Sequence, residues 1–358
     1  MALSEVLPGE PVTNRDMAAR FGLHEQWLDR MTGNRSRYFC TEDSPAGVPR
    51  STADLATAAG AQAIEAASVD PASLDFLVLT TASPDHLMPA TVNLVADRLG
   101  LNDLPTFQLM SGCAGALQGL YTARALLAGG MRRGLVIGAD TCLKLWPSAR
   151  DIKTMKPAEI INFALFGDGA GAAVVDADTH GGPGLVVEHL FLRTIGKGRK
   201  PAQIIRWYGA GGAPQVPGPN GPNGPTSREP MGEEDYKAIE RHVPETASAI
   251  LAELTAVTGW PVAEVEHILT PQLNGVMTEK IREHLGVRPD QAVSCVAETG
   301  NNGNALPFIQ LHRALRRIDA GIGAGGRVLV ATVESSKWII SGMALRHRPD
   351  VPAVSDVA

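Results

Sequence analysis

The chain has 358 residues, of which 44% are hydrophobic and 20% charged, and its formal net charge is −6. This length predicts two domains or two fused halves, while the acidic balance and the lack of a basic run argue against a nucleic-acid partner. No apolar stretch is long enough to span a membrane, and no basic-then-apolar leader opens the chain, so we expect a cytoplasmic protein with no membrane partner.

Apolar runs and helical spacing predict alternating elements in the first half of the sequence. We expect helices over 52–67, 90–99 and 113–129, and strands over 75–81, 106–110, 133–138 and 171–176. The same rhythm returns later, with helices expected over 245–259, 277–285 and 307–321 and strands over 265–270 and 327–333. Such alternation is typical of parallel or mixed sheets with helices on their faces, and its repetition indicates internal duplication.

The two expected halves are 1–176, which carries a candidate nucleophilic cysteine, and 177–358. Within the second half, residues 209–230 are rich in Gly, Pro and Asn. This composition predicts a surface loop that forms neither helix nor sheet. Two interpretations stay open for it, a flexible lid over a substrate entrance or a solvated insertion.

Four cysteines lie far apart in the chain and form no CxxC pair, namely Cys40, Cys113, Cys142 and Cys295. Neither a disulfide framework nor a zinc site is expected, and no cofactor is implied. Cys113 differs from the others because small residues surround it where a buried strand turns into a helix. A thiol at a helix N-terminus meets unpaired N–H groups that favour thiolate, the nucleophilic form. From these residues alone, a covalent acyl-enzyme and a buried structural cysteine are both open.

Several segments together resemble the ketoacyl-ACP synthase III family of thiolase-fold condensing enzymes. The matching segments are 11–14 with Trp27 and 32–33, 81–91, the Ser-Gly-Cys-Ala-Gly elbow at 111–115, Leu-Phe-Gly-Asp-Gly-Ala-Gly-Ala at 165–172, and Glu-Thr-Gly-Asn-Asn at 298–302 followed by Leu-Pro at 306–307. The glycines at 166–171 lack the Lys-Ser/Thr partner of a phosphate loop, so we expect them to allow close backbone packing.

The resemblance implies an α/β, five-layered αβαβα thiolase-like fold of two similar fused halves, and usually a homodimer. It also implies that acyl-CoA or an acyl carrier protein is substrate and partner. Cys113 matches the residue that accepts the acyl group, and Asn301 matches the asparagine that holds a thioester carbonyl. Backbone N–H groups near the cysteine complete the oxyanion hole.

The family's catalytic histidine is missing. The family carries it in a Pro-His-Gln-Ala-Asn segment, where this chain has Pro-Gln-Leu-Asn at 271–274. Pro271 takes the histidine position, or Gln272 if the match shifts by one residue. Proline offers no side-chain donor, and glutamine donates a hydrogen bond but cannot shuttle a proton.

Three other side chains are candidates to replace the histidine or to sit near it. Glu334 and Ser336 follow a late strand where the family has bare glycine backbone, and Glu334 is a candidate general base if burial raises its pKa. The alternative is that Glu334 points to solvent or pairs with Lys337. His86 is a candidate proton carrier or a residue of the dimer interface, whereas His267 is expected to pack or cap.

Substrate-binding candidates follow from the resemblance. Trp27 matches a residue that stacks on the adenine of CoA, although the Arg that usually follows it is Met31 here, next to Arg30. Arg35 is a phosphate-binding candidate, with solvation as the alternative. Met88 matches the side chain that enters the partner's acyl pocket.

These features predict a ketoacyl-ACP synthase III-like acyltransferase, acting in specialised metabolism or in fatty-acid or polyketide biosynthesis. Cys113 takes an acyl group from CoA or carrier protein and passes it to an acceptor, as an ester, an amide or a carrier-bound chain. One alternative is decarboxylative carbon–carbon condensation with altered machinery. Another, from a different class, is a non-catalytic partner that shapes the pocket of a condensing enzyme.

Overall fold

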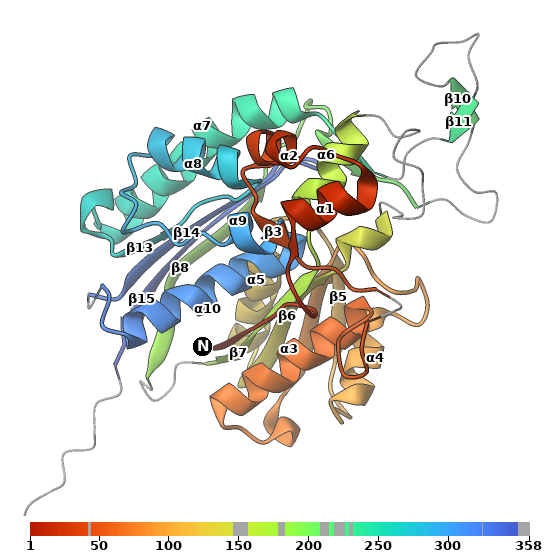
Figure 1. Cartoon of the computed structure of the whole chain (residues 1–358). Coiled ribbons are helices and arrows are strands. Elements are labelled where there is room, and N and C mark those ends of the chain that lie inside the picture. Colours follow the sequence, from red (N-terminus) through yellow and green to blue (C-terminus); the bar gives the residue numbers. More distant parts are fainter. Residues whose placement is uncertain are drawn as a thin grey trace, which may run out of the picture.

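The computed structural model describes residues 1–41, 44–145, 157–177, 183–207, 215–217, 226–228, 232–323 and 325–349. Two large sheets dominate it (Figure 1). The first has the strand order β1-β7-β6-β4-β5, formed by β1 (Ala2–Val6), β7 (Gly169–Asp176), β6 (Arg133–Asp140), β4 (Phe76–Thr81) and β5 (Thr106–Met110). The second has the order β13-β14-β15-β8, formed by β13 (His267–Leu269), β14 (Arg327–Glu334), β15 (Ile339–Arg348) and β8 (Gly184–Thr194).

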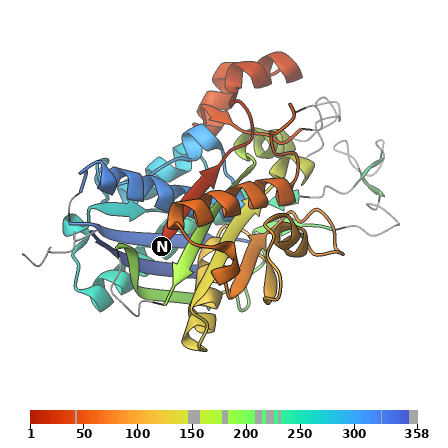
Figure 2. The ribbon, with the colours of Figure 1, turned by 90° about the horizontal axis from the view of Figure 1, so that it is seen from below.

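Helices form three layers around these sheets. The outer face of the first sheet carries α3 (Thr52–Ala67) and α4 (Thr91–Arg98), the space between the sheets holds α5 (Gly115–Ala128) and α10 (Leu306–Asp319), and the outer face of the second sheet carries α7 (Tyr236–Thr258) and α8 (Gly275–His284). Figure 1 shows this stacking, and Figure 2 shows α3 lying across the first sheet. The five-layered α/β architecture expected from the sequence is confirmed.

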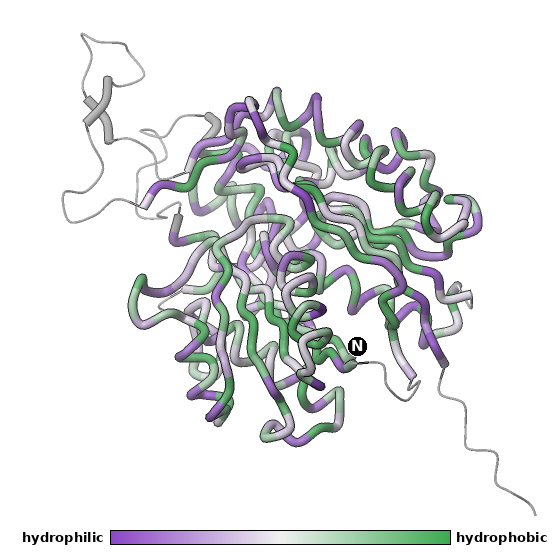
Figure 3. The backbone as a smooth tube through the Cα atoms, turned by 180° about the vertical axis from the view of Figure 1, so that it is seen from behind, coloured by the Kyte–Doolittle hydropathy of each residue, from purple (hydrophilic) through white to green (hydrophobic). Residues whose placement is uncertain are grey.

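The layers are held together by three apolar cores, one at each outer helix layer and one at the central helices. In the central core Leu117 and Leu120 of α5 and Phe308 and Leu311 of α10 pack against strands of both sheets, and all four are buried. Figure 3 shows the hydrophobic colour running along the strands of both sheets. Burying one such side chain contributes about 1.5–3 kcal/mol, so the central helices tie the two sheets into one body.

The two halves share one topology. In the first sheet β4 pairs in parallel with β5 and β6, and β7 and β1 follow antiparallel. In the second sheet β13 pairs in parallel with β14 and, through a single bridge, with Ala292. β15 then pairs antiparallel with β14, and β8 pairs antiparallel with β15. Since α5 and α10 hold equivalent places in this order, the N-terminus of each central helix is brought to the same end of the molecule.

Shorter elements gather around that end. They are β2 (Val12–Thr13), α1 (Asn14–Phe21), α2 (Glu25–Thr32), β3 (Ser36–Arg37), α6 (Pro157–Leu165), β9 (Gln203–Ile205), β12 (Gly232–Glu234) and α9 (Val296–Thr299), together with the 3-10 turns η2 (Cys142–Leu145) and η5 (Gly303–Ala305). Two further 3-10 turns, η1 (Pro71–Ser73) and η4 (Val262–Glu264), directly precede β4 and β13 at the other end of the sheets. Among them β9 and β12 pair antiparallel and form a two-stranded ribbon.

Two helix starts differ from expectation. The helix expected from residue 245 begins at Tyr236, where the Asp235 side chain caps it by accepting from the backbone N–H of Ala238 at 3.0 Å. Pro244 lies inside the helix, one residue before the expected start, although proline removes one helical hydrogen bond. The helix expected from Cys113 begins at Gly115, which leaves Cys113 in the preceding turn.

The expectation that residues 209–230 form no sheet is wrong for part of the segment. The strands β10 (Gln215–Pro217) and β11 (Thr226–Arg228) pair antiparallel. The rest of the segment, residues 208–214, 218–225 and 229–231, lies outside the described residues, so the lid and the solvated insertion both stay predictions.

The glycine-rich turn at 166–171 serves packing, as expected. A Cβ on Gly167 would lie 2.4 Å from the carbonyl oxygen of Thr299, so this backbone approach requires glycine. Among the described helices, none is long and apolar enough to cross a membrane.

Candidate active site

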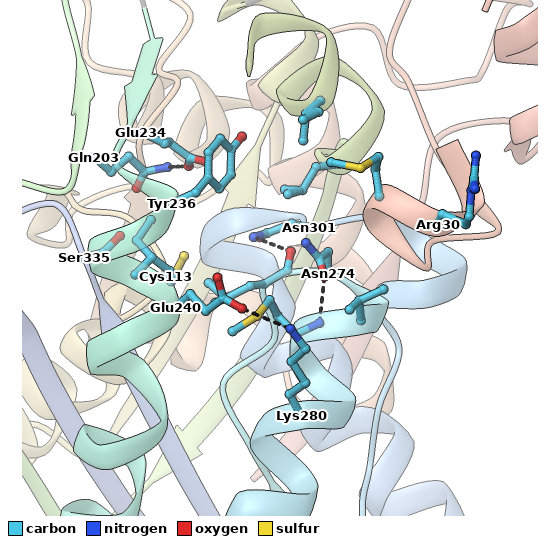
Figure 4. A pocket seen from close by; sticks show the side chains of 17 residues that line it. Arg30, Cys113, Gln203, Glu234, Tyr236, Glu240, Asn274, Lys280, Asn301 and Ser335 are labelled. Carbon is cyan, nitrogen blue, oxygen red and sulfur yellow. Dashed lines mark hydrogen bonds and ion pairs between the residues drawn. The ribbon is translucent and has the colours of Figure 1, made fainter. Parts of the chain in front are cut away.

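Both halves of the chain line one cavity of about 360 Å³ near the N-termini of the central helices. Figure 4 shows its polar side chains, with Cys113 and Asn301 pointing toward a common space. The wall is otherwise mainly apolar, built from Met31, Ile161, Leu165, Ile239, Leu273, Val276 and Met277. Over the described residues, no group of His, Cys, Asp and Glu side chains is arranged to hold a metal ion.

Cys113 lies in the turn that joins β5 to α5, and its side chain is partly buried. The turn is closed by a hydrogen bond from the Gly115 N–H to the Gly112 carbonyl oxygen at 2.8 Å. Ala114, the N-cap residue of α5, provides no side-chain cap. The N–H groups at this helix end therefore need acceptors from elsewhere in the chain.

The expected stabilisation of the Cys113 thiolate is not found. Burial raises the pKa of this thiol to about 12, and the negative charges of Glu334 and Glu234 add to the rise. Desolvation thus outweighs the backbone hydrogen bond at Cys113, which acts to lower this pKa. Cys113 rests as a thiol at neutral pH and needs a base in order to act as a nucleophile.

Glu334 supplies the acceptor that the cysteine turn lacks. Its carboxylate is buried and accepts the backbone N–H groups of Gly112 at 3.0 Å and Ala114 at 3.4 Å. The hydroxyl of Ser336 also donates to it. Glu334 therefore neither points to solvent nor pairs with Lys337, whose amino group donates to the Arg199 carbonyl. The cavity wall contains Ser335 but not Glu334 or Ser336.

Asn301 lines the cavity beside Cys113 and is held in a fixed orientation. Its Nδ2 donates to the carbonyl oxygen of Leu273 at 3.2 Å, and its Oδ1 accepts the N–H of Gly303 at 3.1 Å. An amide nitrogen carries two hydrogens, so one bond to Leu273 leaves the second for a substrate oxygen.

Asn304 clamps the cysteine turn to the asparagine turn, a role that the sequence analysis did not identify. Its Nδ2 donates to the Ser111 carbonyl at 2.7 Å and to Asp140 at 2.8 Å, and its Oδ1 accepts from the Ser111 hydroxyl at 3.1 Å. A Cβ on Gly115 would lie 1.7 Å from Asn304 Oδ1. Only glycine at the start of α5 leaves room for the Asn304 side chain. The asparagine-rich run at 301–304 was the sequence signal that could have identified this role.

The side chain of Gln272 bonds to backbone groups and does not line the cavity, so its catalytic role stays a prediction that this geometry does not favour. Its Oε1 accepts the N–H groups of Cys295 at 3.0 Å and Val296 at 2.9 Å, and its Nε2 donates to Val293 at 2.9 Å. All of these partners are backbone groups outside the cavity wall. Its neighbours Leu273 and Asn274 line the cavity instead.

No described histidine lines the cavity. His86 is exposed on the loop before α4, next to Met88, whose exposed fraction is 89%. The structure does not bring His86 to Cys113 within this chain, and the interface roles of His86 and Met88 stay predictions. His267 is buried with Nε2 at 3.1 Å from the Ile322 carbonyl oxygen, which confirms its packing role.

The substrate-binding candidates of the N-terminal region lie outside the cavity wall. Trp27 packs in an apolar cluster around Phe163. Arg35 is exposed and pairs with Glu298 at 2.7 Å. Arg30 and Met31 of α2 line the cavity in their place.

Glu234 is the functional candidate that sequence reasoning missed. It ends β12 in the cavity wall and accepts a hydrogen bond from Gln203 Nε2 of β9 at 2.6 Å. Burial raises the pKa of Glu234 to about 7, against the opposing effect of Tyr236 and Gln203. No local motif marks it, because the pairing of β9 with β12 brings it to the site.

Comparisons with known proteins match the chain along most of its length. Sequence models of 3-oxoacyl-[acyl-carrier-protein] synthase III match residues 107–191, and those of its C-terminal part match residues 255–334. A beta-ketoacyl-[acyl-carrier-protein] synthase III of Streptomyces coelicolor is 30% identical over 331 residues, which cover 92% of this chain and 91% of that protein. An acetoacetyl CoA synthase of a Streptomyces species is 30% identical over 339 residues, covering 92% and 95%.

Two solved structures are similar along nearly the whole chain. The tetronic acid condensing enzyme AbyA1 superimposes with a TM-score of 0.84 and 42% identity, covering 96% of this chain and 98% of that one. The 3-oxoacyl-(acyl carrier protein) synthase III of Pseudomonas aeruginosa gives a TM-score of 0.78 and 25% identity, with 98% of each chain covered.

Proposed function

We propose a function on the premise that the chain belongs to the 3-oxoacyl-[acyl-carrier-protein] synthase III family. The protein is an acyltransferase of the condensing type. It takes an acyl group from the thioester of CoA or of a carrier protein onto Cys113. It then passes this group to an oxygen nucleophile on a second substrate, in a pathway of specialised metabolism.

One observation carries this proposal: Cys113 and Asn301 share a cavity that no described histidine lines. Acyl loading needs a thiol, a donor for the carbonyl oxygen and a base. Decarboxylative condensation needs in addition a donor pair that holds the extender enolate. The histidine of that pair is replaced by Pro271, or by Gln272 if the match shifts by one residue, and neither lines the cavity. Transfer to oxygen has no enolate to stabilise and uses the groups that are present.

The likeness to a tetronic acid condensing enzyme supports an oxygen acceptor. A tetronic acid is a five-membered lactone, so closing its ring includes an acyl transfer to a hydroxyl oxygen. We therefore expect the second substrate to carry a hydroxyl group next to a thioester or acid function.

The loading step assigns a role to each group in the cavity. The thiol of Cys113 attacks the thioester carbonyl, and the N–H of Cys113 and the second Nδ2 hydrogen of Asn301 donate to the developing oxyanion. Glu334 keeps the turn in position by binding the N–H groups on either side of the cysteine. Removing one donor from such a site costs about 10²–10³ in rate.

Acyl transfer to Cys113 is tested by incubation with a panel of acyl-CoA and acyl-carrier thioesters, followed by digestion and mass mapping. We expect an acyl adduct on the peptide containing Cys113, and none in Cys113→Ala. If no thioester of the panel leaves an adduct, the proposal is wrong and a non-catalytic role is favoured.

The synthase III relatives favour a second candidate, decarboxylative carbon–carbon condensation. Addition of a malonyl thioester to the acylated protein separates the two candidates. We expect no CO2 release above that of Cys113→Ala. Release at a rate tied to Cys113 would establish condensation in place of transfer to oxygen.

A further inference from the structure

We propose that Glu234 is the general base of this site, taking the proton first from the Cys113 thiol and then from the hydroxyl of the acceptor. This inference rests on the proposed function, because it assigns a residue to each proton transfer that acyl loading and acyl transfer require. In this proposal Glu234 of β12 takes over the proton transfers of the missing histidine, although it lies far from residues 271–274 in the sequence.

The position of Glu234 supports the assignment. Glu234 and Cys113 line the same cavity, and the negative charge of Glu234 is one of those that raise the pKa of the thiol. Gln203, also in the wall, fixes the carboxylate by donating to Oε1 at 2.6 Å. Figure 4 shows Glu234, Gln203 and Tyr236 grouped on one side of the cavity with Cys113. Proton transfer needs a base that reaches the nucleophile directly or through one water. The shared cavity gives Glu234 and Cys113 a common space in which such a contact can form.

The surroundings leave the carboxylate without a cationic partner in the described contacts. On its own ribbon, Arg206 pairs with the neighbouring Glu233 at 2.7 Å. On α7 and α8, Glu240 and Lys280 pair with each other at 3.0 Å. The described side chains of α6, residues 160–165, carry no charge.

Two further charged groups face the cavity region. Arg30 of α2 lines the wall, and Glu334 binds the backbone of the cysteine turn outside it. Burial therefore dominates the protonation of Glu234, whose pKa of about 7 lets it exist as base and acid at neutral pH. General bases work best when their pKa is near the working pH.

The proton balance closes in both half-reactions. In loading, the sulfur forms a bond to the acyl carbon, the donor's C–S bond breaks, and the thiol proton passes through Glu234 to the departing thiolate. In transfer, the acceptor oxygen forms the ester bond and gives its proton to Glu234. The C–S bond to Cys113 then breaks, and Glu234 returns the proton to the sulfur.

The test is the single-turnover rate at which Cys113 is acylated by an acyl-CoA that modifies the wild-type chain, measured by mass spectrometry from pH 5.5 to 9. At pH 7 we expect Glu234→Gln to acylate roughly 10²–10³-fold more slowly than wild type. The wild-type rate should level off above a pKa near 7, while the variant's rate should keep rising with pH as thiolate becomes available.

Glu233→Gln is the matched control. Glu233 precedes Glu234 on the same strand, is exposed, pairs with Arg206, and lies outside the cavity wall. We expect it to acylate as wild type does, and the circular dichroism of both variants should match wild type.

The outcomes separate the two proposals. If the wild-type chain forms no adduct with any thioester, the proposed function fails and the role of Glu234 fails with it. If the adduct forms and a folded Glu234→Gln acylates at the wild-type rate with the wild-type pH profile, only the assignment of Glu234 is wrong. A slow variant that has also lost the inflection near pH 7 supports it.

Discussion

Two regions each bring one glutamate to Cys113, and they use it differently. The end of β14 provides Glu334, whose buried carboxylate is held by two backbone N–H groups and the Ser336 hydroxyl. The β9–β12 ribbon provides Glu234, which lines the cavity and is held by the Gln203 amide. The first carboxylate bonds to donors of the protein itself, whereas the second lines the cavity.

The comparison teaches that burial and charge alone do not make a catalytic acid or base. What separates the two glutamates is the number and kind of donors that each must satisfy. Glu334 stabilises the shape of the cysteine turn, and Glu234 is available to exchange a proton. Changes at the site should therefore divide into those that disturb structure and those that disturb chemistry.

The largest effect is expected from removing the group that both glutamates serve. Cys113→Ala should lower acyl transfer by a factor on the order of 10⁶, as loss of a nucleophile does. Because alanine preserves the turn, the melting temperature should stay close to that of wild type. If acyl transfer continued in this variant, Cys113 would not be the nucleophile. Steady-state acyl transfer and thermal unfolding are the measurements.

Glu334→Ala should next lower the free energy of unfolding by roughly 2–4 kcal/mol, because the Gly112 and Ala114 N–H groups lose their acceptor. Urea unfolding measures this change. Glu334→Gln keeps an accepting oxygen and should cost about half as much. An unchanged unfolding midpoint for the alanine variant would mean that Glu334 does not support the turn.

The pH dependence of stability should mark Glu234. Its pKa rises from 4.5 to about 7 on folding, so the folded state binds the proton more tightly. Stability from this group is therefore present below pH 4.5 and decreases as pH rises to 7, by up to about 1.4 kcal/mol per pH unit. Glu234→Gln should lack this decrease when unfolding is followed by urea titration at several pH values. Parallel curves for variant and wild type would contradict the shift.

The smallest effect is expected at a third glutamate, Glu240, which also borders the cavity but is exposed and paired with Lys280 at 3.0 Å. Exposed ion pairs contribute about 0–1 kcal/mol, and salt screens them. Glu240→Gln should change the urea midpoint little, and less again in high salt. If the free energy of unfolding fell as much as in Glu334→Ala, a carboxylate bonded to buried backbone N–H groups would stabilise the protein no more than an exposed one.

The fold, and the meeting of Cys113 and Asn301 in one cavity, could be predicted because short sequence signals encode them. The small residues around Cys113 and the asparagine-rich run that contains Asn301 are motifs, and the alternation of apolar runs gave the layers. Element ends were less certain, as at Pro244, where tertiary packing keeps a helix intact past a residue that favours a break.

Side-chain direction could not be read from the sequence. Gln272 occupies the expected segment but turns toward the backbone of Cys295 and Val296. Glu334 was placed near the cysteine, yet its target is the backbone of the turn. Glu234 had no signal at all, since its place in the wall depends on the pairing of two short strands distant in sequence.

The Asn304 clamp has a consequence for how this site changes over time. By bonding Ser111 and Asp140 at once, it ties the cysteine turn and the asparagine turn to each other and to the end of β6. The cavity's outer wall, from α2, α7 and α8, belongs to other segments and lies outside these turns. Selection can therefore reshape the choice of acceptor through the wall while the reacting centre stays constant, so chemistry and selectivity can evolve separately.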